Sequence, residues 1–262
     1  NGHQLLCAGR ISAKFDIFAL AEGKISISSA QLFGMKATLS KPSANGKANY
    51  QFIIDSLKTE NTTAQPSLDL SVKSLIIRNS RIKYDQQDIA HTNSFSLKHL
   101  DITNLSTHIM LNILKEDSLN LFVKKISCTE HSGLKINNIS FNIIANKQEA
   151  KLNNLVISLP HSNIAIPMMS GMYHYSGGKL DMFSIRYVGE LKGELNPSDL
   201  SFIMPTLHSH NKTYSIHSTF RGTNSFFRVN NFLLRTENRN LIKANGSILN
   251  WNNRPSWNAE IQ

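Results

Sequence analysis

Residues 152–157 read LNNLVI: an apolar residue, two asparagines, a second apolar residue, one further position and a third apolar residue. The same pattern occurs as INNISF at 136–141 and as VNNFLL at 229–234. In a β-strand, side chains alternate between the two faces, so the second and third apolar positions share a face. The first position joins that face only if the backbone bends at the asparagines.

Asparagine is suited to such a bend because it tolerates the left-handed backbone region better than other non-glycine residues. We therefore interpret the pattern as a strand corner, at which one extended piece ends and a new strand begins with its apolar side facing inward. Corners and bulges of this kind curve a sheet.

Four looser copies replace the asparagines with other polar or small residues. They are VKSLII (72–77), LKHLDI (97–102), VKKISC (123–128) and LDMFSI (180–185). Their spacing is irregular, which favours a repeated local device over a solenoid repeat. The flanking residues are β-branched or alternate with polar ones, and this favours strands over helices. The sequence predicts a mainly all-β fold, an elongated and repeatedly bent sheet with one apolar face.

Two short helices interrupt this pattern. Tyr50, Ile53, Ile54 and Leu57 have helical spacing. A second helix is expected within 197–207, because Pro197, Ser198 and Asp199 form a helix start and Pro205 ends it after about two turns. Residues 58–67 are polar and contain a proline, typical of a linker. We expect a β segment with a short helix at 1–57, a linker at 58–67 and continuing β repeats at 68–262.

Composition narrows the class of protein. The chain has 262 residues, of which 40% are hydrophobic, and no window approaches the roughly 18 apolar residues of a membrane helix. It begins at Asn1 without a visible signal peptide and ends within a strand-like pattern, so we expect a piece of a longer protein. Two cysteines, Cys7 and Cys128, are too few for a disulfide scaffold.

The net charge of +10 comes from scattered basic residues, whereas a nucleic-acid surface usually clusters them. FFRVNNFLLR (226–235) interleaves aromatic and basic residues but is better explained as a buried strand. A mildly basic surface suits an anionic lipid surface or simple solubility.

Motifs for chemistry are missing. YSGGKL (175–180) lacks the first glycine and the hydroxyl residue of a phosphate loop and predicts a hairpin turn. His208, His210 and His217 lie close in sequence, but no acidic residue or cysteine is at ligand spacing, and their role stays open. No nucleophile elbow or zinc-protease helix is present. We expect neither an enzyme, nor a cofactor, nor a metal site.

Three stretches resemble the AsmA-like superfamily, specifically the TamB-type proteins of bacterial envelopes. They are FDIFALAEGKISISSAQLFGMKATLSKP followed by NYQFIIDSL (15–57), LSVKSLIIRNSRIKYD (70–85) with Asn79 at a usual turn position, and GELNPSDLSFIMPTL (193–207). The resemblance extends over essentially the whole chain but rests on diffuse β patterns.

The resemblance implies a sheet folded into a groove, or taco, with an apolar inner face. It also implies a periplasmic location within a protein anchored in the inner membrane, with membrane contact through regions outside this chain. The implied function is movement of phospholipids between the inner and outer membranes, with outer-membrane assembly proteins as possible partners and no nucleic acid.

Independently of the resemblance, a bent sheet with one apolar face either fills itself with side chains or stays open and buries another molecule, such as lipid tails. Candidate lining residues for acyl chains are the last two apolar positions of the corners, and a packed core is the alternative for each: Leu75, Ile77, Leu100, Ile102, Ile139, Phe141, Leu155, Ile157, Phe232 and Leu234.

Two other functions stay open. An interaction scaffold would hold an unfolded β client through exposed strand edges during assembly of the outer membrane. A carbohydrate-binding or adhesin module would need an exposed aromatic row, for which only Trp251 and Trp257 supply tryptophan.

Overall fold

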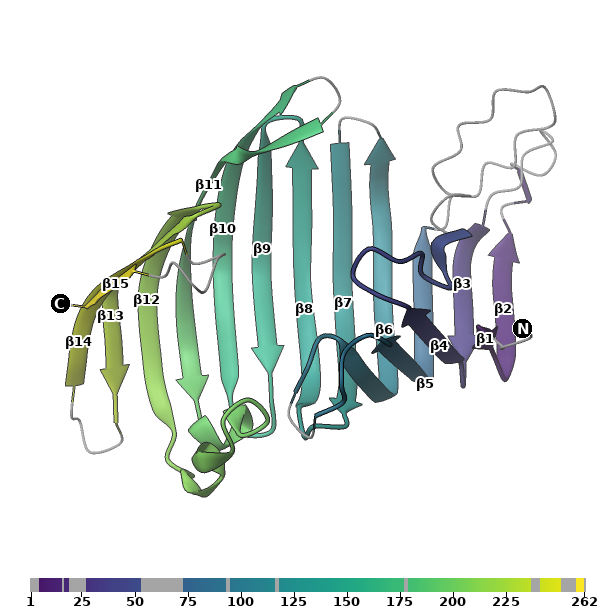
Figure 1. Ribbon diagram of the computed structural model, residues 1–262. Coiled ribbons are helices and arrows are strands. Elements are labelled where there is room, and N and C mark those ends of the chain that lie inside the picture. Colours follow the sequence, from purple (N-terminus) through teal and green to yellow (C-terminus); the bar gives the residue numbers. More distant parts are fainter. Residues whose placement is uncertain are drawn as a thin grey trace. The chain divides into compact units, whose positions relative to one another are not determined.

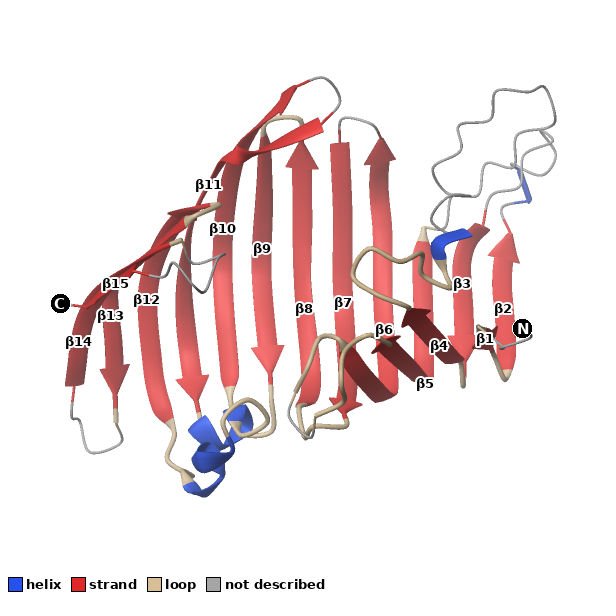
Figure 2. Ribbon diagram, in the orientation of Figure 1, coloured by secondary structure: helices blue, strands red, loops and turns tan. Residues whose placement is uncertain are grey.

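A computed structural model describes most of the chain as strands of a single open sheet (Figures 1 and 2). The described residues are 5–15, 17–18, 27–52, 73–92, 95–115, 118–176, 179–236, 241–250 and 258–261. The predicted all-β class is confirmed. The expected linker at 58–67, most of the helix expected around Tyr50–Leu57, and both tryptophans lie outside the described residues.

Most of the strands are long, and several exceed ten residues. Their bounds are β1 Leu6–Cys7, β2 Arg10–Phe15, β3 Ile27–Phe33, β4 Lys36–Lys41, β5 Ser74–Gln86, β6 His99–Lys115, β7 Ser118–Glu130, β8 Lys135–Asn146, β9 Glu149–Ser158, β10 Asn163–Ser176, β11 Lys179–Leu195, β12 Tyr214–Thr223, β13 Phe226–Arg235, β14 Leu241–Leu249 and β15 Asn258–Ile261.

From β4 to β15 each strand is hydrogen-bonded to the next in chain order, and β1 and β2 form the other end of the sheet against β4 and β3. Among the described residues β15 pairs only with β14, so the sheet does not close on itself. The chain divides into two compact units, residues 1–110 with 125–135 and residues 111–124 with 136–262.

In the first unit, β3 and β4 act as one interrupted strand that runs parallel to β5. The interruption is at Gly34, which has a φ of 60°, a value that glycine adopts without steric cost. Beside it, the buried Ser80 of β5 fills the gap in the ladder. Its hydroxyl accepts the Met35 amide proton at 3.0 Å and donates to the Arg78 carbonyl at 3.0 Å, so no buried amide is left without a partner there.

The second unit contains β8 to β15, in which all neighbours are antiparallel and follow chain order (Figure 1). The hairpin predicted at 175–180 is confirmed, because Ser176 pairs with Lys179 and Tyr175 with Leu180. Such tight antiparallel connections need no crossover, which is why the strands stack in sequence order.

The asparagine corners are β-bulges. Asn154 and Asn231 have φ values of 53° and 51°, as the pattern predicts, and Asn79 has 46°. At Asn154, β9 has one residue more than β8 between the pairs Ser140–Val156 and Asn142–Asn153. At Asn231, β13 has one residue more than both of its neighbours. An extra residue of this kind bends a strand and increases its twist.

Other copies of the pattern do not bend where we expected. INNISF shows no left-handed asparagine, and the irregularity beside it belongs to Asn154 of the facing strand. In the copies at 72–77 and 97–102, the left-handed residues come later, at Asn79 and Asn104. The copy at 180–185 does fall on an irregular pairing between β10 and β11. Apolar spacing alone therefore does not locate a bend. In the strands with a positive-φ asparagine the bulge is at that residue, whereas the irregular pairing at 180–185 has no asparagine.

Helical structure forms at 197–207 as expected, but not as a single helix of two turns. Two 3₁₀ turns form instead, η1 Pro197–Leu200 and η2 Pro205–Ser209. The predicted start is confirmed, since Pro197 is the first residue and the side chain of Asn196 accepts the Ser198 amide proton at 3.1 Å. Pro205 begins the second turn because proline suits a first helical position but cannot continue a helix.

Little of this protein is a buried core. Among the described residues the buried apolar side chains are only Met35, Ala37, Val123, Cys128 and Ile216. A sheet without a second layer leaves many of its apolar side chains partly exposed to water. The candidate site is built from such side chains.

Candidate functional site

Strand register brings one apolar row across the second unit. Residues paired directly across neighbouring strands point to the same side of a sheet. Ile139 of β8 is paired with a residue of β9, which is paired in turn with a residue of β10, and so on to β14. Its members are Ile139, Ile157, Ile164, Gly193, Ile216, Leu234 and Ile242.

Two further rows follow on the same side. The first is Ile143, Leu152, Met169, Gly189, Phe220, Val229, Gly246 and Ile261. The second is Ala145, Ala150, Gly171, Tyr187, Gly222, Phe227 and Ile248. We call this side of β8 to β15 the apolar face. None of the residues in its three rows is charged, and the tyrosine hydroxyl is the only polar side-chain group among them.

The asparagine bulges keep this face continuous. Leu152 and Leu155 are an odd number of positions apart, so a regular strand would place them on opposite faces. The extra residue at Asn154 shifts the alternation of side chains by one position, so Leu152 and Leu155 point to the same face. Leu152 pairs with Ile143, and Leu155 pairs with Ile166. Asn231 does the same for Val229 and Phe232, which pair with Gly246 and Ala244.

Aromatic rings cover glycines on this face. A Cβ added to Gly189 would be 2.5 Å from Cζ of Phe220, and one added to Gly222 would be 2.4 Å from the Tyr187 hydroxyl. The Phe220 ring centroid lies 6.5 Å from that of Tyr187 and 6.1 Å from that of Phe227. These spacings suit tilted aromatic pairs, which add to the burial of apolar area.

Six of the predicted lining residues belong to this face. Ile139, Ile157 and Leu234 are in the first row, and Leu155 and Phe232 are held on it by the bulges. Phe141, two positions from Ile139 along a regular strand, shares its side. All six are half-buried, neither packed in a closed core nor fully exposed.

The remaining four predicted residues share one face of the first unit. Leu75 pairs with Ile109 and Ala30, while Ile77 pairs with Thr107 and Leu32. Past the bulges at Asn79 and Asn104, Ile102 pairs with Ile82 and Leu100 with Tyr84. These four side chains are also half-buried.

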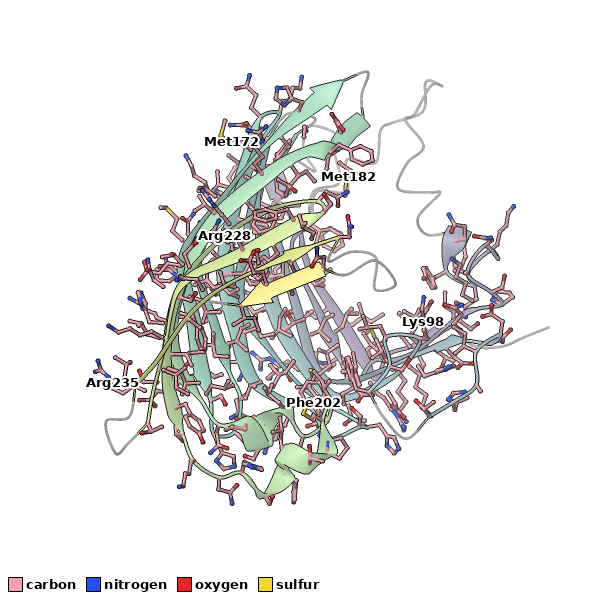
Figure 3. The ribbon with its side chains drawn as sticks, turned by 60° about the vertical axis from the view of Figure 1, so that its left-hand side comes forward. Lys98, Met172, Met182, Phe202, Arg228 and Arg235 are labelled. Atoms are coloured by element: carbon pink, nitrogen blue, oxygen red, sulfur yellow. The ribbon has the colours of Figure 1, made fainter. Side chains whose placement is uncertain are left out.

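The reverse face of the second unit carries the charge. Arg221 pairs directly with Arg228, and a cavity of about 540 Å³ lies beside Arg221, Arg186 and Met172. Figure 3 shows Met172, Arg228 and Arg235 projecting from the same side of this strand array, as the register requires. Alternation therefore separates a charged side from an apolar one within single strands.

Hydrogen bonds hold two carboxylates of the first unit ionised. Asp101 accepts from Arg81 Nε at 2.7 Å, and this bond, above all, lowers the pKa of Asp101. Burial works to raise the pKa of Glu130, but hydrogen bonds from Ser132 and from the amides of Asp101 and His131 outweigh it, so the net shift is downward. Burial raises the pKa of the Cys128 thiol.

The histidines singled out in the sequence do not come together. His208 and His210 are exposed at η2, while His217 on β12 lies with Nε2 2.9 Å from Glu190 Oε1 on the neighbouring strand. A different group converges in the first unit, namely Asp85, His91 and His99. Sequence reasoning missed it because the three residues are separated by a loop and follow no ligand motif.

Comparison with known proteins gives no relative: no family model, no curated protein and no solved structure matches this chain. Within the described residues, none of the helices has the length and apolar character needed to cross a membrane.

Proposed function

We propose that this chain is a segment of a periplasmic, inner-membrane-anchored protein that binds phospholipid acyl chains on its apolar faces and conducts them between the inner and outer membranes. The observation that carries the proposal is the apolar face of β8 to β15, whose three paired rows contain no charged residue. The envelope location rests on the resemblance to AsmA-like proteins.

Hydrocarbon suits this face better than a polypeptide does. The backbone groups of its inner strands are already paired in the ladder, and the rows supply almost no side-chain donor or acceptor. A peptide laid on the face would have to bury its own amides without partners, which costs about 1–3 kcal/mol for each group. An acyl chain brings no such groups.

The gain from covering the face is substantial. Fully burying one Leu, Ile or Phe side chain is worth about 1.5–3 kcal/mol, and the predicted lining residues are only half-buried. Binding of this kind needs no catalytic residue. A lipid could move along the rows because each contact is weak, non-directional and similar to the next.

The decisive experiment compares neighbours on one strand. Leu155 and Ile157 are on the apolar face, while Val156 between them is on the reverse face, where it pairs with Ser140 and Ala165. We expect native mass spectrometry of the purified chain to detect co-purifying phospholipid. We expect Leu155→Asp and Ile157→Asp to lose it and Val156→Asp to retain it.

Photocrosslinking groups placed at the same three positions test the idea without adding a charge. Capture of lipid at 155 and 157 but not at 156 supports the proposal. Capture at 156 alone would reverse the assignment of faces. A lipid-free, stable protein that captures nothing would refute lipid binding.

A scaffold for envelope assembly is the second candidate, because both ends of the sheet have an edge without a paired neighbour among the described residues. At β15, Ile261 is 82% exposed, and at β2, Ile11 is 66% exposed. Edges of this kind can pair with a client strand. Crosslinking of an unfolded outer-membrane protein to β15 or β2, without lipid capture at 155 and 157, would favour the scaffold.

A further inference from the structure

One side-chain cluster in the first unit is independent of the apolar face. Asp85 on β5 and His99 on β6 are directly paired across the strands, and His91 comes from the loop that joins them. By the alternation of side chains, this pair lies on the face opposite Tyr84 and Leu100. One potential ligand atom from each of the three residues lies within 4.8 Å of the other two.

Both imidazoles contact the same carboxylate oxygen. His99 Nδ1 is 2.7 Å and His91 Nε2 is 3.1 Å from Asp85 Oδ1, and the two rings lie 4.0 Å apart between centroids. Tetrahedral zinc with bonds of about 2.0–2.1 Å places its ligand atoms roughly 3.3 Å apart. The observed separations need only a small outward adjustment of the carboxylate.

The sheet holds the His99 ring in place. Its side chain is only 8% exposed, and its Nδ1 is the nitrogen that faces Asp85 Oδ1. The other ring nitrogen, Nε2, has no hydrogen-bond partner within the described part of the chain and is not the nitrogen that faces the carboxylate. His91, in contrast, is 74% exposed and can move to complete a site.

We propose that Asp85, His91 and His99 bind a divalent transition-metal ion of the zinc type. Two imidazoles and one carboxylate are the donors that such ions take in sites with three protein ligands. A cavity of about 320 Å³ adjoins the three residues and is also lined by Glu130, His131 and Lys83. It leaves room for water or an anionic ligand at a fourth position.

The ion would tie His91, in the chain that follows β5, to the β5–β6 pair. This site does not depend on the proposed lipid function, and its test does not use lipid.

The test is isothermal titration calorimetry of the chelator-treated 262-residue chain with Zn²⁺, backed by Co²⁺ absorption spectra. We expect one Zn²⁺ per chain and visible Co²⁺ bands of a low-coordinate nitrogen and oxygen site. His91→Ala is the main variant, because this exposed loop side chain can be removed without disturbing the sheet. We expect it to weaken Zn²⁺ binding by about tenfold or more, since loss of even an outer partner of a metal ligand costs about 10–100-fold.

The matched control is the double variant His208→Ala/His210→Ala, which removes two exposed histidines at η2 and should bind Zn²⁺ as the parent does. Asp85→Asn tests the carboxylate and should also weaken binding. The proposal is wrong if Zn²⁺ produces no saturable heat, if His91→Ala binds as tightly as the parent, or if the control variant abolishes binding.

Discussion

At Asn154 the backbone has a φ of 53°, a conformation that costs most L residues about 1–2 kcal/mol. Asparagine reduces this cost, and the exposed position leaves its side chain in water. At Asn231 a second asparagine assists, because Asn245 Oδ1 accepts the Asn231 amide proton at 2.9 Å. Single residues thus determine which side chains of a whole strand point to the apolar face.

We expect Asn154→Ala to lower the free energy of unfolding by about 1 kcal/mol and Asn154→Gly to leave it nearly unchanged, because glycine adopts positive φ freely. Urea titration followed by circular dichroism measures both. Asn137→Ala is the control, since Asn137 is exposed in β8 without a positive φ. An equal loss in Asn137→Ala and Asn154→Ala would contradict the bulge explanation.

At a few glycines, the backbones of neighbouring strands lie too close together for a larger residue. Gly193 of β11 has a φ of 150°, and a Cβ added there would lie 2.1 Å from the Asn163 carbonyl oxygen of β10. Gly171 of β10 has ordinary space, with the nearest atom at 3.7 Å. The same substitution should therefore have very different effects on two neighbouring strands.

We expect Gly193→Ala to destabilise the second unit by several kcal/mol, because a backbone oxygen cannot move aside as a flexible side chain can. Gly171→Ala should change stability by less than about 1 kcal/mol. Thermal unfolding and amide hydrogen exchange of β10 and β11 measure the difference. Similar stability of the two variants would show that β10 and β11 are further apart than described.

The β5–β6 element should also respond to acid. The folded pKa of Asp101 is lowered, mainly by its hydrogen bond from Arg81. A depressed carboxyl pKa adds stability above the unfolded pKa, about 3.9, and that stability is lost as pH falls through the folded value.

We therefore expect Asp101→Asn to be less stable than the parent at neutral pH, with the deficit shrinking below about pH 4. Urea titrations across the acid range test this, with Asp181→Asn on an exposed position of β11 as control. A deficit of the same size at neutral and strongly acid pH would indicate lost packing rather than lost charge.

For the whole molecule, the unusual quantity is how little apolar surface is buried. Five apolar side chains are buried among the described residues, and one of them, Ile216, belongs to the paired rows of β8 to β15. Most other side chains of these rows are half-buried, while Ile242 and Ile261 are exposed. Folded proteins are stable by a small margin between large terms. A ligand that covers these rows should therefore have a clear effect on stability.

We expect a short-chain phospholipid, added below its micelle concentration, to raise the unfolding temperature of the parent chain and of Val156→Asp but not of Ile157→Asp. A ligand at 100 times its Kd stabilises by about 2.7 kcal/mol. Differential scanning calorimetry measures the shift. Equal shifts in all three proteins would point to non-specific detergent action.

Local chemistry allowed much of this fold to be predicted from the sequence. Period-two alternation specified the strands, the asparagine pairs at 153–154 and 230–231 specified bulges, and Ser-Gly-Gly-Lys at 176–179 specified a hairpin, because each depends on neighbouring residues alone. The same local rule places six of the predicted lining residues on one side of the sheet. The 3₁₀ geometry at 197–209 was missed because short apolar spacing does not distinguish helix types.

The neighbours of each residue across strands were decided only by the tertiary structure, because they depend on strand register. Asn138 and Asn154 occupy the same place in one local pattern, but only Asn154 has a positive φ. The parallel pairing of β3 and β4 with β5 joins segments far apart in the chain. The Asp85, His91 and His99 cluster exists because β5 and β6 pair in one register and their loop folds back. Side-chain alternation is a property of each strand, but the neighbours across strands are set only when the chain is paired.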